Sequence, residues 1–471
     1  MDLTDPPMDF HGTRQLRAAT IARGMYYQML PQMDASQREN AIALWKSEDI
    51  HEPQIFERIV ATTYWVIGSE KLWIARLYAI LFWLVGGVAL YDLSRRMTNE
   101  DGGLFSLALY LVTPFSVSAS RSFQPDPFMV MWILVAAWSL YRWSETPSWK
   151  WAILSGIFGG IAILIKSVAV IMVGMMAAVI VLTVSGFRDG IKSPQIWAMA
   201  GLMLIPPALY ALSIRDSSSG YIQFWILDTR GLLAQPRFYF QWLKVLTGIL
   251  DFSLLLVAAA AVALLKPRGR AISLGLWAGF ILFGLAMPFQ ISTHDYHNVM
   301  IIPTASLSLA PVAALVFGKV AEEKRIWQAF FLSVAILAIA HQLWVSRNAL
   351  LSMDYRAEAK AWQAMGEVLP EDGEMIALTH DYGRRLRYYG ERVVRTWPLR
   401  IDFEVMAARG EPYDGNFEAL FIEQTSGADY FLINLFSELD QQPELKNHLY
   451  ENYPILMQGD GYLLFDLRGG P

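Results

Sequence analysis

The chain has 471 residues, of which 54% are hydrophobic and 17% are charged, and it contains no cysteine. Soluble domains contain roughly 25% charged residues, so this composition is typical of a membrane protein. The lack of cysteine excludes disulfides, thiolate metal sites and cysteine nucleophiles. The formal charge of −5 gives no support to nucleic-acid binding.

Residues 1–57 are polar and contain no hydrophobic span. They contain several arginines, and the runs Asp9-Phe10-His11-Gly12-Thr13-Arg14-Gln15 and His51-Glu52-Pro53 hold acids and two histidines. The next segment, 55–67, is too short and too charged to span a membrane alone, so we expect an interfacial helix or the start of the next span. Such polar groups in front of a membrane domain indicate a reaction centre at the bilayer surface.

Ten apolar segments follow, each compared with a membrane span of about 20 residues. They lie at roughly 72–94, 103–120, 127–142, 149–165, 168–186, 196–213, 241–265, 271–290, 298–318 and 326–346. Every second loop is rich in Lys and Arg, which places these loops in the cytoplasm. Residues 1–57, the loop 214–240 and everything after 347 are then expected outside.

An N-terminus outside the membrane needs a segment that carries it across. We therefore expect a helix upstream of this sequence, in preference to translocation of the short tail without one. Without that helix the stretch around Asp9 would be tethered at one end only, and this form is expected to be weakly active or inactive.

The composition changes after residue 350. The segments 373–378, 428–433 and 461–467 have the pattern of strands, and the segments 401–409, 416–424 and 437–451 have that of amphipathic helices. These elements predict an α/β domain of about 100 residues, large enough for its own core. The chain is thus expected to contain an outer catalytic loop with amphipathic helices (1–57), a transmembrane bundle (58–347) and an extracytoplasmic α/β domain (348–471).

Ionisable residues are scarce inside the predicted spans, with Asp251 as the clearest exception. A transporter would more often show charges and broken helices at the membrane midplane. The polar residues gather instead at the predicted outer ends: Asp9, His11, Arg14, Arg17, His51, Glu52, Arg121, Asp126, Lys166, His294, Asp295 and His297. A shared cavity at the outer face would explain this distribution.

Several motifs occur in a characteristic order. They are Asp9 to Gln15 with Ile21-Ala22-Arg23 and Tyr26-Tyr27, Glu52-Pro53 with Ile55-Phe56, Trp73 and Arg76 with Arg95-Arg96, Ser120 to Pro127, Lys166, and His294-Asp295-Tyr296-His297. Over about residues 8–345 this order resembles bacterial members of the dolichyl-phosphate-mannose–protein mannosyltransferase family. The resemblance implies the GT-C membrane fold, eleven or more spans, and an outward-facing site in a bacterial inner membrane.

The chain departs from the family pattern in three places. The usual first helix is absent, Glu52-Pro53-Gln54 lacks the common double proline, and Phe10-His11 replaces the acid that follows the first Asp. This variant pattern leaves the sugar and the acceptor open.

The resemblance implies transfer of a sugar, with inversion, from a polyprenyl phosphate to the hydroxyl of a lipid, glycan or protein. Asp9 is the expected base for the acceptor hydroxyl. Arg14, Arg17, Arg121 and Lys166 are candidates for the lipid phosphate, since a guanidinium fits phosphate oxygens in a bidentate way. Asp126 is expected to orient the sugar or tune an arginine. The other expected substrate-binding residues are His51, Glu52, His294, Tyr296 and His297.

Each of these residues also has a structural interpretation. Asp9 could cap a helix over 13–30, and Arg14 and Arg17 could share a solvated helix face. Asp126 could be a turn residue, and Lys166 could anchor a helix end by snorkelling. The basic run Arg384 to Tyr389 could bind acceptor or lipid head groups, but a solvated helix face is the default expectation.

Two further questions stay open. His51, Glu52, His294 and Asp9 could bind a divalent metal through oxygen and nitrogen, although no His-x-x-x-His spacing supports this. The competing functions are a transporter or flippase of a lipid-linked sugar intermediate, which would depend on a midplane group such as Asp251, and a non-catalytic scaffold that displays the C-terminal domain.

Overall fold

The computed structural model describes residues 3–49, 52–214 and 226–469. Contacts divide the chain into two compact units. The membrane unit comprises residues 1–3, 50–56 and 73–353, and the sheet unit comprises residues 4–49, 57–72 and 354–471. Most of the polar N-terminal stretch thus belongs to the same unit as the C-terminal part, while the functional division into three parts stays a prediction.

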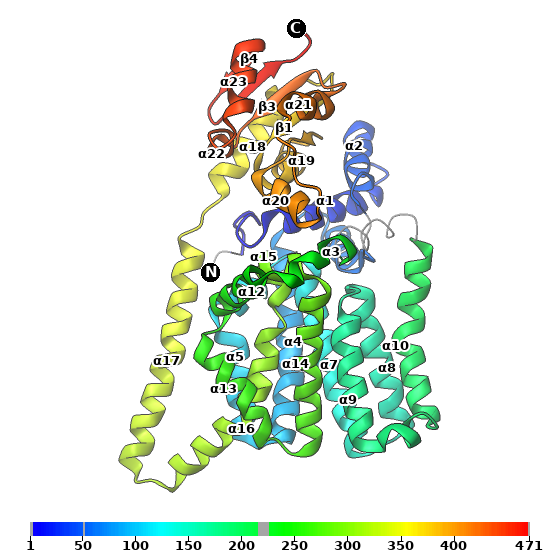
Figure 1. The fold of residues 1–471 in the computed structure, drawn as a ribbon, viewed down its shortest axis with the longest axis vertical. Helices are drawn as coiled ribbons and strands as arrows, with labels where there is room; N and C mark the ends of the chain where they lie inside the picture. The colour runs from blue at the N-terminus through cyan, green and yellow to red at the C-terminus, as the bar shows by residue number, and fades with distance from the viewer. Residues whose placement is uncertain (1–2, 50–51, 215–225, 470–471) are drawn as a thin grey trace. The chain divides into compact units, whose positions relative to one another are not determined.

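The membrane unit is helical throughout its described residues (Figure 1). Its helices are α4 (Trp73–Met97), α5 (Glu100–Val112), α6 (Pro114–Ala119), α7 (Pro125–Glu145), α8 (Trp149–Ile165), α9 (Ala169–Gly190), α10 (Pro194–Ser213), η2 (Asp228–Ala234), α12 (Pro236–Ile249), α13 (Phe252–Ala261), η3 (Val262–Leu264), α14 (Pro267–Ala286), α15 (Pro288–Thr293), η4 (Asp295–Asn298), α16 (Ile301–Glu322) and α17 (Arg325–Leu351). All ten predicted segments contain a helix.

Six helices in the described part of the chain are long and apolar enough to cross a membrane. A seventh span results if α12 and the segment 252–264 count as one, although they meet at an angle of 92°. The helical polytopic class is confirmed, but the number of ten is not reached. Length explains part of the shortfall, because α5 has 13 residues and α8 has 17, fewer than the roughly 20 that a span needs. α7 has 21 residues, but it includes Asp126, Arg142 and Glu145.

Glycines allow the membrane helices to approach closely. A Cβ atom at Gly160 of α8 would lie 2.5 Å from the carbonyl oxygen of Leu202 in α10. A Cβ atom at Gly275 of α14 would lie 2.6 Å from the Cα atom of Met176 in α9. Lipid tails are as apolar as leucine, so such close packing is a main source of helix association in a membrane.

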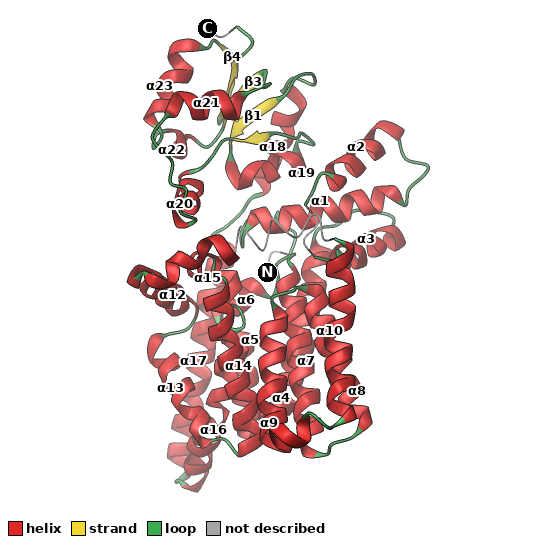
Figure 2. Cartoon of the chain, turned by 45° about the vertical axis from the view of Figure 1, so that its right-hand side comes forward, coloured by secondary structure: helices red, strands yellow, loops and turns green. Residues whose placement is uncertain are grey.

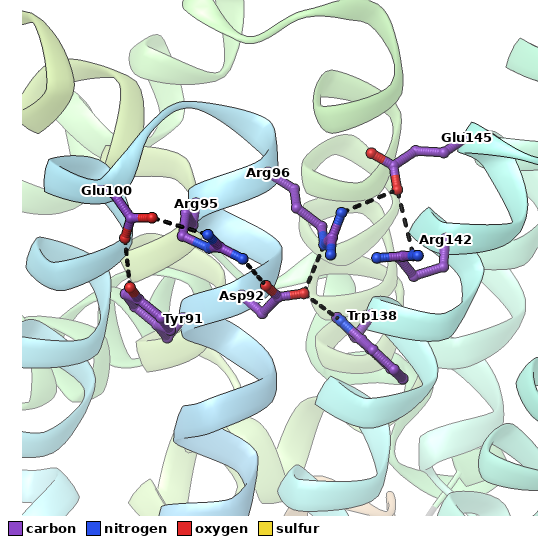
Figure 3. A network of polar contacts seen from close by, with 8 residues as sticks. All are labelled: Tyr91, Asp92, Arg95, Arg96, Glu100, Trp138, Arg142 and Glu145. Carbon is purple, nitrogen blue, oxygen red and sulfur yellow. Dashed lines mark hydrogen bonds and ion pairs between the residues drawn. The ribbon is translucent and has the colours of Figure 1, made fainter.

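A network of three acids and three arginines joins one end of α4, α5 and α7 (Figure 3). Asp92 lies at its centre and accepts hydrogen bonds from Arg95, Arg96 and the indole of Trp138 at 2.6–2.8 Å. Glu100 pairs with Arg95, and Glu145 pairs with Arg96. The arginines at this end of α4 are therefore matched by Asp92 of the same helix and by acids of α5 and α7.

The sheet unit contains a five-stranded sheet with strand order β2-β1-β3-β5-β4. Figure 2 shows strands of this sheet in yellow. The pairs β1/β2 and β1/β3 are parallel, and β3/β5 and β4/β5 are antiparallel. The strands are β1 (Met375–Leu378), β2 (Arg395–Thr396), β3 (Tyr430–Ile433), β4 (Ile455–Gly459) and β5 (Tyr462–Asp466). The helices of this C-terminal part are α18 (Arg356–Val368), η5 (His380–Gly383), α19 (Arg384–Tyr389), α20 (Arg400–Ala408), α21 (Phe417–Thr425), α22 (Phe436–Leu439) and α23 (Pro443–Asn452).

The core of the sheet is apolar because β1 and β3 are buried along their whole length. Ile376, Phe431 and Phe465 from three adjacent strands pack with Trp397 and with residues of α21 and α23. The predicted α/β domain is confirmed, and its three predicted strands correspond to β1, β3 and β5.

Three N-terminal helices contribute to the sheet unit: α1 (Gly12–Gln28), α2 (Ala35–Lys46) and most of α3 (Ile55–Ile67). Arg23 of α1 joins them to the C-terminal part. Its guanidinium lies 3.8 Å from the ring centroid of Tyr388 in α19, and its Nε lies 3.0 Å from Glu70 Oε2. Tyr26 of α1 and Tyr64 of α3 pack edge to face at 5.8 Å. Residues 55–67, expected as an interfacial helix or as the start of the next span, form the helix α3, which ends before α4 begins.

Candidate functional site

Asp126 and Lys166 form a buried ion pair in the membrane unit, with Lys166 Nζ 2.8 Å from Asp126 Oδ1. Asp126 lies in the first turn of α7 between Pro125 and Pro127, where the helix dipole favours a carboxylate. Lys166 follows the last residue of α8 in an extended conformation. Its side chain is 3% exposed, so it binds a buried partner rather than snorkelling to a surface.

Two residues of the predicted patch 294–297 lie beside this pair. Lys166 Nζ is 5.4 Å from the ring centroid of Tyr296, and the rings of Tyr296 and His297 are 4.4 Å apart. The His294 ring is 5.6 Å from that of Tyr296, and its Nδ1 lies 2.8 Å from Thr293 Oγ1. Four predicted residues from three distant segments, Asp126, Lys166, Tyr296 and His297, therefore meet in the membrane unit.

A small cavity of about 10 Å³ opens beside the pair and is lined by Asp126, Lys166 and His297 together with apolar side chains such as Phe283 and Met300. That volume holds about one water molecule. Asp126 Oδ2 is buried and has no hydrogen-bond partner among the described residues. Since a buried carboxylate oxygen without a partner costs free energy, the cavity provides the place for a polar group of a water or a ligand.

The other candidates of the membrane unit are less closely connected. Arg121 is 7% exposed and lies between α6 and α7. Glu52 is half-buried just before α3. His51 lies outside the described residues. The part of the chain that the structure describes holds no group of three or more His, Asp or Glu suited to a metal ion.

Asp9 belongs to the sheet unit and is half-buried. The N-cap of α1 is His11 rather than Asp9, so Asp9 does not have the capping position that the structural interpretation required. Gln15, which is fully buried in the first turns of α1, donates from its Nε2 to Asp9 Oδ1 at 3.1 Å and to the Phe10 carbonyl at 2.8 Å. The Asp9 carboxylate is therefore oriented by a fixed side chain.

Arg17 shares a single carboxylate with two arginines of α19. Glu48, whose side chain is fully buried, contacts Arg17, Arg384 and Arg387. Burial lowers the pKa of Arg384, the attraction of Glu48 opposes this effect, and the like charge of Arg387 adds to it. The basic run of α19 is thus engaged with the N-terminal segment, which differs from the default expectation of a solvated face. Arg14 is half-buried on α1.

Three residues near these groups were missed by the sequence reasoning. Burial raises the pKa of the Tyr355 phenol, and the charge of Asp9 raises it further. Asn298 accepts from Trp242 at 2.9 Å and donates to the Ile291 carbonyl at 2.8 Å, which fixes the loop of His294 and His297.

The third missed residue is Gln290 of α15. It is 5% exposed, and neither of its amide atoms has a hydrogen-bond partner among the described residues. An uncharged residue within an apolar segment gives no signal in a single sequence, so only the structure identifies these groups.

A comparison with solved structures finds the same fold over nearly the whole chain. ArnT from Cupriavidus metallidurans bound to undecaprenyl phosphate matches with a TM-score of 0.57 and 16% identity, over 98% of this chain and 95% of that chain. Its apo structure matches with a TM-score of 0.55 and 16% identity, over 98% and 94% of the two chains. The oligosaccharyltransferase AglB from Archaeoglobus fulgidus, in complex with an inhibitory peptide and a dolichol-phosphate, matches with a TM-score of 0.55 and 12% identity, over 94% of this chain and 70% of that chain.

The comparison of sequences agrees with the fold. Residues 51–210 match the family described as dolichyl-phosphate-mannose-protein mannosyltransferase, whereas a search of the curated proteins finds no match. The matched segment includes Glu52, Arg121, Asp126 and Lys166. The predicted resemblance to the dolichyl-phosphate-mannose–protein mannosyltransferase family is confirmed over residues 51–210, and the fold over nearly the whole chain is the one seen in ArnT and AglB.

Proposed function

We propose that this protein transfers a sugar from a polyprenyl phosphate to an acceptor hydroxyl on the outer side of a bacterial inner membrane, with inversion at the sugar. The observation that carries the proposal is the match over nearly the whole chain to two folds solved with such lipids, ArnT with undecaprenyl phosphate and AglB with dolichol-phosphate. The acceptor is a hydroxyl of a lipid, a glycan or a protein.

In the proposed reaction the acceptor oxygen attacks the anomeric carbon from the face opposite the phosphate. The new carbon–oxygen bond forms as the bond to the phosphate oxygen breaks, and the electron pair leaves with the polyprenyl phosphate. The hydroxyl proton moves to the carboxylate of Asp9, which acts as a general base. The hydrogen bond from Gln15 to Oδ1 orients this carboxylate.

The leaving phosphate needs positive charge, not an acid, because it is already a good leaving group. Lys166 uses one of the three donors of its ammonium on Asp126. In this proposal the remaining donors of Lys166, together with Arg121, bind the phosphate, while Asp126 holds Lys166 and contacts the sugar. Arg14 and Arg17 of the sheet unit stay the other candidates for the phosphate. Glu52, His51, His294, Tyr296 and His297 complete the substrate contacts of the proposal.

The polyprenyl chain needs an apolar surface within the bilayer. The membrane unit has an apolar cavity of about 780 Å³, lined by residues of α5, α13, α16 and α17 such as Phe105, Leu254, Val316 and Ile339. Pockets of about 300–1,000 Å³ that are mostly apolar are typical ligand sites. The cavity supports binding of a lipid chain in this unit.

The test uses cells that lack the protein and accumulate its unused lipid-linked sugar, which mass spectrometry identifies. Wild-type protein is expected to clear this lipid, and Asp9→Asn is expected to leave it, at equal abundance in the membrane. Asp251→Asn is the matched control, because Asp251 is exposed and caps α13 by accepting from the Ser253 amide at 2.8 Å. Clearance by Asp9→Asn at the wild-type rate would overturn the base assignment.

The same two variants distinguish sugar transfer from the competing function of a transporter or flippase. A transporter or flippase would move the lipid-linked sugar between leaflets without forming a glycosidic product. Loss of flux in Asp251→Asn, with full activity in Asp9→Asn, would favour that function instead.

A further inference from the structure

We propose that the C-terminal α/β part positions the catalytic base, and that Asp381 is the positioning residue through which it does so. The inference rests on the proposed function, since Asp9 is the base in that proposal. It assigns a role to residues 354–471 that differs from display on a scaffold. Asp9 and Asp381 both belong to the sheet unit.

Asp381 lies directly against the beginning of α1. Its Oδ1 accepts a hydrogen bond of 2.9 Å from the hydroxyl of Thr13, although 368 positions separate the two residues in sequence. A carboxylate at a helix N-terminus interacts favourably with the partial positive charge of the first amides. The first turn of α1 contains no acid of its own, so Asp381 supplies this charge from another element.

The carboxylate of Asp381 occupies the space beside Gly12 of α1. A Cβ atom at Gly12, the first residue of α1, would lie 2.7 Å from Asp381 Oδ2. Real Cβ atoms essentially never come that near a heavy atom, so an alanine at this position must displace the carboxylate. Gly12 does not have a positive φ, so the effect of an alanine at this position comes from the space that Asp381 occupies.

The backbone of Asp381 is itself in an unfavourable conformation. Asp381 has a φ of 51° and Tyr382 a φ of 52°, and Gly383 follows with 74°. Two successive non-glycine residues in the left-handed region are costly, and such strain persists where the surroundings determine it. This segment connects the carboxyl end of β1 to α19, and it turns the carboxylate of Asp381 towards α1.

Two further side chains hold the Asp381 carboxylate in place. Arg385, one turn later, donates from its Nε to Asp381 Oδ2 at 2.6 Å. The same guanidinium contacts Glu358 of α18, and Glu358 also accepts from the indole of Trp362. The support for Asp381 therefore extends from α19 into α18, two helices of the C-terminal part.

The start of α1 in turn determines where Asp9 lies. Only three residues separate Asp9 from Thr13, and within them His11 has a φ of 55°. Gln15 of α1 holds Asp9 Oδ1, and its position depends on the register of that first turn. A displacement of about 1 Å in such a group can lower a rate by about 100-fold. Asp381 acts on Asp9 through this short and rigid connection.

The first experiment compares three variants by how fast they clear the accumulated lipid-linked sugar in cells that lack the wild-type protein. Asp381→Gly removes the carboxylate and keeps the left-handed backbone accessible, and we expect at least about 10-fold slower clearance. Asp381→Asn also tolerates that backbone and keeps an acceptor for Thr13, so we expect it to retain most of the activity. Asp429→Ala is the control, because Asp429 caps the turn before β1 by accepting from the Glu374 amide and lies at the opposite end of the strands.

A readout of position accompanies the readout of activity. Hydrogen exchange of the amides in residues 9–16 is expected to rise in Asp381→Gly and to stay near wild type in Asp381→Asn and Asp429→Ala. A residue that merely stabilised the fold would change exchange across the whole sheet unit. Unchanged exchange at residues 9–16 in Asp381→Gly would overturn the inference.

A double-mutant cycle gives the sharpest test. Gly12→Ala alone is expected to slow clearance by about 10-fold, because the new methyl group displaces Asp381. In the Asp381→Gly background the same substitution is expected to have little further effect, since the obstacle is gone and alanine favours a helix. Additive losses would show that Gly12 and Asp381 do not act on each other, which would overturn the inference.

The two proposals fail in different ways. If Asp9→Asn clears the lipid-linked sugar normally, the base assignment falls, whatever the exchange at residues 9–16 shows. If Asp9→Asn is inactive while Asp381→Gly has normal clearance and normal exchange, the base assignment stands and the positioning role falls.

Discussion

Removal of the Lys166 ammonium gives the most informative perturbation of the membrane unit. In Lys166→Met the carboxylate of Asp126 stays buried without its partner, and Oδ2 already has no hydrogen bond among the described residues. At 2.8 Å and an effective dielectric constant of 20, the lost attraction is about 6 kcal/mol. Desolvation of the two ions offsets part of it, and breaking a buried pair costs about 3–5 kcal/mol in measured cases.

Removal of both charges is expected to behave differently. In Lys166→Met with Asp126→Leu no charge is left in the interior, and well-packed apolar replacements of a buried pair are often neutral. We therefore expect the double variant to recover most of the stability that the single variant loses. It is also expected to stay inactive, because both groups serve the proposed transfer.

The assay is reversible unfolding of the purified protein in mixed micelles of increasing denaturing detergent. Wild type, Lys166→Met, Asp126→Leu and the double variant form a thermodynamic cycle. A loss of less than about 1 kcal/mol in Lys166→Met would refute the view that the pair is desolvated. Equal losses of unfolding free energy in Lys166→Met and in the double variant would show that the packing of Lys166, not its charge, is responsible for the loss.

Three smaller predictions address other groups. Gln290→Met is expected to raise the free energy of unfolding by about 1–2 kcal/mol, because it removes a buried amide that has no hydrogen-bond partner among the described residues. It is also expected to slow clearance of the lipid-linked sugar, as a sugar-binding amide would require. Unchanged stability and unchanged clearance would contradict the two predictions. Asp92→Asn is expected to cost about 1 kcal/mol in the same unfolding assay, since its partners are partly exposed; wild-type stability would show that the network contributes nothing. Burial and then the charge of Arg385 lower the pKa of His380, so the unfolded state binds the proton more readily. The neutral His380 side chain should therefore contribute its full stability to the sheet unit above pH 6.5, and this contribution should be lost as the pH falls through the lowered pKa. In thermal unfolding, His380→Gln should make the stability less dependent on pH.

The elements that could be predicted from sequence are those with a strong local pattern. The buried strands β1, β3 and β5 were predicted because each is a run of apolar residues bounded by turns. β2 escaped notice because it has two residues, and β4 because it has exposed residues along its length. α19 was predicted as a solvated face because its arginines are visible in the sequence, whereas their partner Glu48 lies more than 330 positions away.

The candidate site shows the same limit. The order of the motifs identified Asp126, Lys166, Tyr296 and His297 before any of their contacts were known. Which of them form a pair, and which oxygen is left without a partner, depends on distances that a single sequence does not contain. Asp381 was invisible for this reason, because its role comes from one hydrogen bond across 368 positions and from two left-handed residues.

The composition of the sheet unit bears on the scaffold hypothesis. If the membrane helices were only a scaffold that displays residues 354–471, the contacts of these residues with the N-terminal stretch would be few and exposed. Instead Glu48 is fully buried against Arg384 and Arg387, and Arg23 is held between Glu70 and Tyr388. Removing one partner of such a buried pair leaves the other uncompensated. The segment that carries Asp9 therefore depends on the C-terminal part for its own fold, so loss of that part should abolish transfer even where the membrane helices remain intact.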